Sequence, residues 1–275
     1  MARHSTGRTD GSNRGRARKI LLALSVMFLC VPSALTSMPS AEAAASKQVL
    51  VLGDSLVGGS SNYINFHLSH DGKVRTTIKA IGGAAICDLL AGNGGPWTLE
   101  HLLTAKRYDA VVLAYSGGNY TRCTGYLTGQ QLVDNYRAAA TAVMKISQRH
   151  GVRTVVWVKP PAVAGPEANA LRTSLGALYA SLPSSWPSAN VIDGGASITP
   201  GGKFFRSLPC GSWEKTAAQG CVKNSIRIRA DDGSHFYCKK RPTRPYGLVA
   251  PCDTYSAGSN RYGMNLAATR KFIGL

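Results

Sequence analysis

The sequence predicts an α/β fold, namely a flavodoxin-like three-layer α/β/α sandwich on a parallel sheet of about five strands. Segments with strand signals alternate with segments with helix signals, as they do in repeated β-α-β units. The first, third and fourth strand candidates are almost continuously apolar, which is typical of strands buried on both faces. Gly-rich and polar segments follow the first three strand candidates, where ligands bind in an open parallel sheet.

The strand candidates are short apolar or β-branched runs bounded by Gly or Pro. They cover residues 48–52, 74–81, 109–115, 152–158 and 190–193. Gly53 ends the first run, and Pro160-Pro161 stops the fourth. These boundaries give the sheet its predicted strands.

The clearest helix candidate covers residues 128–150. Its apolar side chains recur at intervals of three and four residues, which predicts one buried stripe: Leu132, Tyr136, Ala139, Val143 and Ile146. Thr128 is a suitable N-cap and Gly151 a suitable stop. We expect further helices over residues 167–182 and 260–273, and one directly after Ser55.

Residues 1–45 have the layout of a Sec-type secretory signal peptide. Residues 1–19 are rich in Arg and Lys, residues 20–35 are mostly apolar, and small residues end at Ala43-Ala44-Ala45. The interrupted apolar run is too short for a comfortable transmembrane helix. We therefore predict cleavage near Ala43 to Ala45, secretion to the extracellular space and no stable membrane span after cleavage. Retention as an uncleaved anchor is the alternative.

The predicted mature chain, residues 46–275, is long enough for one domain with a substantial core. Its even number of cysteines indicates disulfides in an exported protein. The sequence leaves the pairing open, and our hypothesis is Cys87–Cys123, Cys210–Cys221 and Cys238–Cys252. Residues 194–259, rich in Gly, Pro and basic side chains, interrupt the alternation of strands and helices. We interpret them as a disulfide-pinned excursion of the same domain.

The predicted mature chain is cationic. The whole chain has 32 basic and 14 acidic residues, and residues 1–45 hold 6 and 2 of them, which leaves 26 − 12 = +14. Such a charge would attract an anionic polymer of the cell envelope, although solubility alone explains it equally well. We expect no nucleic-acid partner, because no recognition motif is present. We expect no zinc site, because neither the cysteines nor the histidines have zinc-ligand spacing.

Residues that can carry chemistry stand at the ends of the predicted strands and near the last helix. Ser55 follows the first strand, Gly82 and Gly83 follow the second, and Asn119 follows the third. Asp232 and His235 are three residues apart shortly before the last helix. Together they offer a hydroxyl, backbone donors, a side-chain amide, a carboxylate and an imidazole, which are the groups that the active site of a serine hydrolase requires.

These blocks resemble the SGNH hydrolase superfamily, the GDSL-type esterases and lipases, and are similar to its secreted actinobacterial members. The four family residues match Ser55 in VLGDSL, Gly83 in AIGGAAIC, Asn119 in SGGNYT and His235 in DDGSHF. A lone Gly-Asp-Ser is a common tripeptide, whereas four blocks in order are a specific signal. The resemblance extends over the predicted mature chain and implies the SGNH hydrolase fold.

The resemblance also implies roles. Ser55 would be the nucleophile, His235 its base and Asp232 the group that orients the imidazole. The backbone N–H groups of Ser55 and Gly83 and the Asn119 amide would form the oxyanion hole. Gly82 is an alternative to Gly83 as donor, and Asp231 is an alternative to Asp232 in the triad. Many family members carry an Asp directly after the Asn, whereas Tyr120 follows Asn119 in this chain. In a purely structural interpretation Ser55 caps a helix, Asn119 forms a turn, and Asp232 and His235 form a loop ion pair.

We therefore expect a secreted serine esterase that hydrolyses carboxylic esters through an acyl-serine intermediate, without a metal or organic cofactor. The substrate would be an acylated glycan, a cell-envelope polymer or a lipid ester. Two alternatives belong to other classes. An O-acyltransferase that acts on glycans would use the same triad, and a carbohydrate-binding module would use the same cleft without catalysis.

Overall fold

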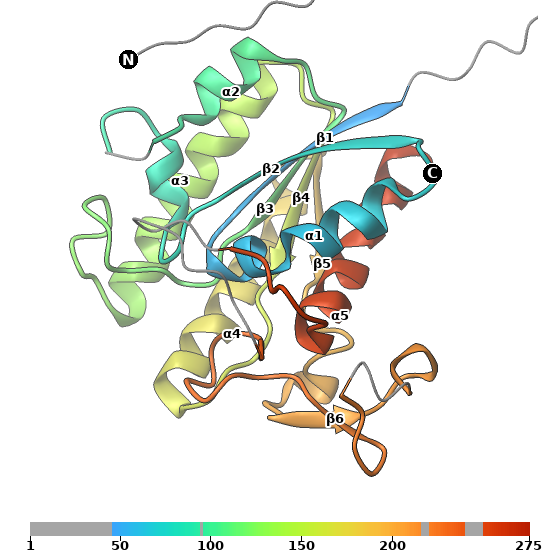
Figure 1. Cartoon of the computed structure of the whole chain (residues 1–275). Coiled ribbons are helices and arrows are strands. Elements are labelled where there is room, and N and C mark those ends of the chain that lie inside the picture. The colour runs from blue at the N-terminus through green and yellow to red at the C-terminus, as the bar shows by residue number, and fades with distance from the viewer. Residues whose placement is uncertain (1–45, 94–95, 216–219, 240–249) are drawn as a thin grey trace, which may run out of the picture. The chain divides into compact units, whose positions relative to one another are not determined.

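The computed structural model describes residues 46–93, 96–215, 220–239 and 250–275. At its centre is a five-stranded sheet in the order β2-β1-β3-β4-β5, in which every neighbouring pair is parallel (Figure 1). The strands are β1 (Lys47–Gly53), β2 (Val74–Ala80), β3 (Ala110–Ala114), β4 (Thr154–Lys159) and β5 (Ala189–Asp193). This is the flavodoxin-like order, so the predicted fold class is confirmed.

Five α-helices occur in the described part of the chain. They are α1 (Ser55–Ser69), α2 (Leu99–Ala105), α3 (Gly129–Arg149), α4 (Pro166–Ser181) and α5 (Ala257–Leu266). The helix expected over 260–273 is divided, because α5 passes at Ala267 into the 3-10 helix η6 (Ala267–Ile273). Helix α2 and the short 3-10 helix η1 (Ile86–Leu89) were not predicted, since segments of this length carry little periodic signal.

Helix α3 forms where its apolar stripe predicts it. The side chains of Leu132, Tyr136 and Val143 are fully buried, and Gly151 follows the helix in the left-handed conformation at φ 67°. Thr128 occupies the N-cap position, but its side chain makes no capping hydrogen bond. Gly129 has φ 52°, so the chain enters the helix through a left-handed residue rather than through a side-chain cap.

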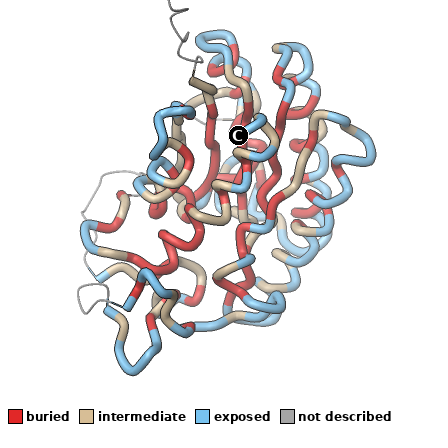
Figure 2. Tube along the Cα trace, turned by 90° about the vertical axis from the view of Figure 1, so that its right-hand side faces the viewer, coloured by how far each residue is buried: buried red, intermediate tan, exposed pale blue. Residues whose placement is uncertain are grey.

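Alternate residues of the strands face two separate cores. Figure 2 shows that buried segments run through the interior of the domain. Leu50, Leu52 and Leu113 pack against α2, α3 and α4. Val51 and Val112 pack against α1 and α5 on the opposite face. The sheet therefore has helices on both faces, as a three-layer sandwich requires.

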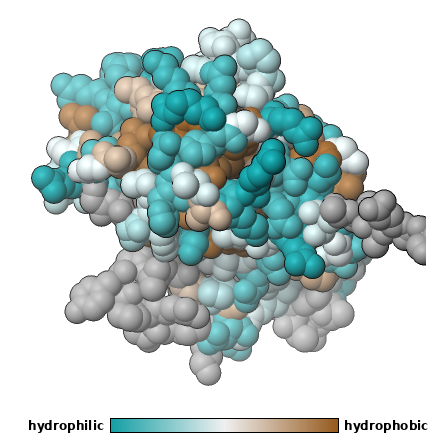
Figure 3. Space-filling model, turned by 90° about the horizontal axis from the view of Figure 1, so that it is seen from above, coloured by the Kyte–Doolittle hydropathy of each residue, from teal (hydrophilic) through white to brown (hydrophobic). Residues whose placement is uncertain are grey.

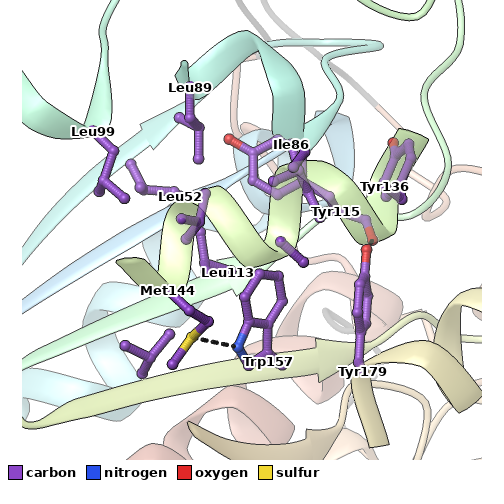
Figure 4. Close-up of a cluster of buried hydrophobic side chains, with 14 of the residues drawn as sticks. Leu52, Ile86, Leu89, Leu99, Leu113, Tyr115, Tyr136, Met144, Trp157 and Tyr179 are labelled. Atoms are coloured by element: carbon purple, nitrogen blue, oxygen red, sulfur yellow. Dashed lines mark hydrogen bonds between the residues drawn. The ribbon is translucent and has the colours of Figure 1, made fainter. Parts of the chain in front are cut away.

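The larger core is organised around Trp157 of β4, which is fully buried (Figure 4). Its ring lies 5.3 Å from that of Tyr179 on α4, and its Nε1 donates to Met144 Sδ at 3.4 Å. The Tyr179 hydroxyl donates to the backbone oxygen of Tyr115 at 2.9 Å. This last contact fixes the end of β3, where the candidate site begins.

The excursion packs against the domain through a small hairpin. Strands β6 (Ser207–Pro209) and β7 (Ser225–Arg227) pair antiparallel. The predicted disulfides Cys87–Cys123, Cys210–Cys221 and Cys238–Cys252 are all formed. Helix α5 follows directly, so the excursion leads into the last layer of the sandwich.

The described residues from 46 onwards fall within one compact unit, Ala43–Leu275. In the view of Figure 3, hydrophilic residues cover most of the surface and hydrophobic ones show mainly between them. Across the described ranges, no helix is long and apolar enough to cross a membrane. The predicted signal peptide, residues 1–45, lies outside the described residues and remains a prediction.

A buried ion pair anchors the excursion to α5. Glu214 has no exposed surface and accepts from the Arg261 guanidinium with both oxygens, one of them at 3.0 Å from Nε. Its Oε2 also accepts from the Gly211 N–H at 2.7 Å, and its Oε1 from the Tyr255 hydroxyl at 3.2 Å. Burial acts to raise the pKa of Glu214, but Arg261 and the other donors lower it, so the carboxylate is ionised.

We predict that Glu214→Ala lowers the free energy of unfolding by about 3–5 kcal/mol, because it leaves the Arg261 charge buried without a partner. Urea unfolding followed by circular dichroism measures this loss. Glu100→Ala is the control, since it removes an exposed carboxylate paired with Arg149 and His150 and should cost much less than Glu214→Ala. Equal losses in the two variants would contradict the assigned anchor.

Candidate active site

Ser55 is the first residue of α1 and follows β1 after one intervening residue. A Cβ on Gly53 would lie 2.6 Å from the Ala114 backbone oxygen and 2.2 Å from Val57 Cγ2, so only glycine fits here. The Ser55 N–H belongs to the first helical turn, where backbone donors have no acceptor within the helix. The position thus combines a hydroxyl with a backbone donor.

The carboxylate of Asp54 connects the ends of β1 and β3. It is 3% exposed, and its Oδ1 accepts from the Leu56 N–H at 3.0 Å, which caps α1. Its Oδ2 accepts from the Ser116 N–H at 2.7 Å and also from the Ser116 hydroxyl. Asp54 is not among the residues for which the sequence predicts a role, although Asp before a helix is a recognisable N-cap signal.

A continuous chain of hydrogen bonds joins Ser55, His235 and Asp232. Ser55 Oγ lies 2.9 Å from His235 Nε2, and His235 Nδ1 lies 2.6 Å from Asp232 Oδ2. An ionised carboxylate only accepts hydrogen bonds, so Nδ1 carries the hydrogen and Nε2 is left to accept from the serine hydroxyl. The structure therefore brings together the three residues expected to form the triad.

Asp232 is held by the turn that it begins. Its Oδ1 accepts from the Ser234 N–H at 2.8 Å and the His235 N–H at 2.9 Å. Partial burial acts to raise the pKa of Asp232, but these donors and the imidazole lower it to about 2. Asp231, the alternative, is 87% exposed in its side chain and pairs with Arg206 and Arg227 instead.

The buried side chain of Arg229 stabilises the turn that begins at Asp232. Its guanidinium is fully buried and donates to the Ser234 oxygen at 2.8 Å and the Ala162 oxygen at 2.7 Å. Burial, followed by the charge of Arg172, lowers the pKa of Arg229 to about 9. Arg229 is not predictable from the sequence, because its acceptors are backbone carbonyl groups that carry no sequence signature.

The loops that carry Gly83 and Asn119 are packed together. Gly83 has φ 73°, which favours glycine there and distinguishes it from Gly82. A Cβ on Gly118 would lie 2.3 Å from the Gly83 oxygen, so the two backbones touch. The Cys87–Cys123 disulfide connects the same two segments, with 5.9 Å between the Cα atoms.

One contact places the second block beside the first, and another orients the Asn119 amide within its own loop. The Ile81 N–H donates to the Gly53 oxygen at 3.1 Å, which brings the second block next to the first. The Asn119 amide Nδ2 donates to the Leu127 oxygen at 3.1 Å, which orients it and leaves its second hydrogen for another acceptor. Gly83 and Asn119 thus lie on the segments that adjoin Ser55, and their role as oxyanion donors remains a prediction.

The site is accessible to solvent, because the side chains of His235 and Asp232 are 37% and 51% exposed. A cavity of about 790 Å³ adjoins it, lined among others by Asn119, Tyr120, Arg172 and Ser234. Among the described residues, no group of three or more His, Cys, Asp or Glu is placed to hold a metal ion.

The fold is similar to that of a carbohydrate esterase family 3 protein from Talaromyces cellulolyticus, with 12% identity, a TM-score of 0.51, and 82% of this chain and 98% of that chain covered. A variant of an acetyl-xylooligosaccharide esterase from Geobacillus Stearmophilus aligns with 14% identity, a TM-score of 0.47 and coverages of 84% and 95%. An acetyl esterase variant with acetate aligns with 11% identity, a TM-score of 0.47 and coverages of 82% and 98%. No protein-family model and no curated protein sequence matches. The first likeness is one of fold, and it agrees with the predicted three-layer α/β/α sandwich.

We predict that Asp54→Asn lowers the free energy of unfolding by about 1–3 kcal/mol and also lowers the initial rate of p-nitrophenyl acetate hydrolysis. The amide nitrogen that replaces one oxygen would face an N–H group, and the start of α1 would lose its fixed position. Urea unfolding and initial rates measure the two effects. Asp134→Asn on the exposed face of α3 is the matched control. If Asp134→Asn lowered the free energy of unfolding and the initial rate as much as Asp54→Asn does, the role assigned to Asp54 would be refuted.

Proposed function

We propose that the protein is a serine esterase that hydrolyses carboxylic esters of acylated glycans through an acyl-serine intermediate. The observation that carries this proposal is the hydrogen-bonded chain from Ser55 through His235 to Asp232. A binding module has no need for a hydroxyl, an imidazole and an ionised carboxylate in this order. The structural interpretation of Asp232 and His235 as a loop ion pair leaves the contact of His235 with Ser55 unexplained.

In the acylation step, Ser55 Oγ attacks the carbonyl carbon of the ester while His235 Nε2 takes the hydroxyl proton. The ionised Asp232 stabilises the imidazolium that forms. The bond from carbon to the alcohol oxygen then breaks, and the alcohol leaves with the proton from Nε2. The product of this step is an acyl-serine and a free alcohol.

The oxyanion that develops in this step needs fixed donors. We propose the Ser55 N–H at the start of α1, the Gly83 N–H and the second amide hydrogen of Asn119. The backbone contact between Gly83 and Gly118, the disulfide and the Leu127 oxygen support this role, because they hold the loops before substrate arrives. Preorganised donors stabilise the transition state without the cost of rearrangement.

In the deacylation step, water attacks the carbonyl carbon of the acyl-serine and gives a proton to His235 Nε2. The bond from that carbon to Ser55 Oγ then breaks, His235 returns the proton to Ser55 Oγ, and the carboxylic acid leaves. The exposure of His235 and Asp232 supports water as the acceptor, since solvent reaches the imidazole directly. A glycan hydroxyl in the same place would make the protein an acyltransferase. The glycan substrate itself is supported by the esterase whose fold the chain shares, which is a carbohydrate esterase. The disulfides support export, since oxidising compartments maintain them.

We predict that Ser55→Ala lowers kcat for p-nitrophenyl acetate by about 10³-fold or more, because the nucleophile is lost. The control is Ser61→Ala, a partly exposed serine in the same helix, which should keep the wild-type rate. Equal rates for wild type and Ser55→Ala would refute the nucleophile. Product analysis with a sugar acceptor present should yield free acetate, and an acetylated sugar as main product would favour the acyltransferase.

We predict that Asn119→Ala lowers kcat by about 10²–10³-fold with little change in KM, as expected for a donor used mainly in the transition state. The loss of the Leu127 contact is a separate effect on stability, which thermal unfolding measures. A variant with normal kcat would exclude Asn119 from the oxyanion hole.

A further inference from the structure

The cavity beside the candidate triad has the size of a binding site for a sugar unit. Its volume is about 790 Å³, within the range of small-molecule sites. Ser234, which precedes His235 in the chain, and Asn119, a proposed oxyanion donor, form part of its wall. The start of α3 and the first turns of α4 line the remainder, including Gln130 and Arg172. A group bound here would adjoin an ester held at Ser55.

Arg172 gives this cavity its charge. It is the one basic residue among the described lining residues, and no ion pair is formed by it within the described ranges. Its Nη1 donates to the Pro161 oxygen at 3.2 Å. Burial lowers the pKa of Arg172, an effect that the carboxylates of Asp54 and Asp232 oppose.

The buried Arg229 adds to this positive environment. Its charge is felt by Arg172, and both guanidinium groups donate to backbone oxygens of the segment after β4. Arg229 is enclosed, but Arg172 is only partly buried and contributes to the cavity wall. A poorly hydrated guanidinium without a carboxylate is a ready partner for one, because its planar donors match a carboxylate in pairs.

Two exposed aromatic side chains stand at the rim. Tyr120 lines the cavity and is 76% exposed, and its ring centroid lies 6.1 Å from that of Tyr126, which is 69% exposed. Tyr126 has φ 61°, a conformation that a bulky residue rarely adopts and that costs free energy. Amphipathic rings held exposed beside a cavity are suited to packing against the face of a sugar.

We propose that this cavity binds a carboxylate-bearing sugar unit of the glycan ester, with Arg172 pairing with the carboxylate and Tyr120 packing against the ring. The proposal rests on the proposed function, since it assigns the substrate class of that same site. Glu167 is the one acid among the described lining residues, and its exposure to solvent leaves its charge screened. The net charge of +14 on residues 46–275 (26 − 12) would attract an acidic polymer over longer distances.

The test compares two polymers of equal acetyl content, an O-acetylated polygalacturonate and an O-acetylated neutral xylan. The wild-type protein should have a higher kcat/KM for the acidic polymer. Arg172→Met should lower the ratio of the two kcat/KM values about tenfold or more, and Arg172→Lys should restore part of it. Added salt should reduce the ratio for the wild type, because screening weakens the pairing.

Arg153→Met is the matched control. Arg153 precedes the amino end of β4, whereas the candidate site lies at the carboxyl ends of the strands, and the Arg153 side chain is 81% exposed. Arg153→Met removes the same charge as Arg172→Met and should keep the wild-type ratio of the two kcat/KM values. An equal fall in the ratio for Arg153→Met would show a general charge effect and overturn the assignment to Arg172. Circular dichroism of Arg172→Met and Arg172→Lys establishes that a changed ratio belongs to folded protein.

The outcomes separate this proposal from the proposed function. Hydrolysis of both polymers with equal kcat/KM would overturn the acidic subsite and leave the esterase intact. Absence of hydrolysis of both polymers and of p-nitrophenyl acetate would overturn the esterase itself. A preference for a succinyl over an acetyl p-nitrophenyl ester, without a preference between the polymers, would place the carboxylate on the acyl group and overturn the sugar assignment.

Discussion

The buried carboxylate of Asp54 is the contact on which the rest of the candidate site depends. Burying a charge is costly unless donors surround it, and here three donors from two segments do so. One of them starts α1 and the other two belong to Ser116, so a single side chain fixes the direction of the helix and the end of β3. Ser55 follows Asp54 directly, so its position is determined by these hydrogen bonds to the start of α1 and the end of β3. The loops that bear Gly83 and Asn119 then pack onto the same edge.

The sequence predicts the sheet well because burial on both faces leaves a strong local record. The strands β1, β3 and β4 are continuous apolar runs, and Gly or Pro residues mark where they stop. The triad was also predictable, since its residues lie in short motifs with fixed spacing. Asp232 and His235 are three residues apart, and the Ser234 and His235 N–H groups close the turn between them by donating to Asp232 Oδ1.

The features that escaped prediction depend on contacts between distant segments. Arg229 donates to Ala162, which lies 67 residues away, and its acceptor is a carbonyl group that any residue offers. The division of the last helix at Ala267 and the short helix α2 carry no periodic pattern that marks them. The cavity likewise arises only when the start of α3 and the first turns of α4 are brought beside the loop after β3. Contacts between segments that are distant in the sequence leave no local pattern from which they could be predicted.

Ser55 and His235, the proposed nucleophile and base, are 180 residues apart, and His235 belongs to the excursion near the end of the chain. Chains are made from the amino end, so during synthesis Ser55 exists long before His235 does. Until the excursion is complete and docked, the serine is an ordinary helix-terminal hydroxyl with no base beside it. The contact of Ser55 with His235 therefore requires that the excursion is docked on the sheet.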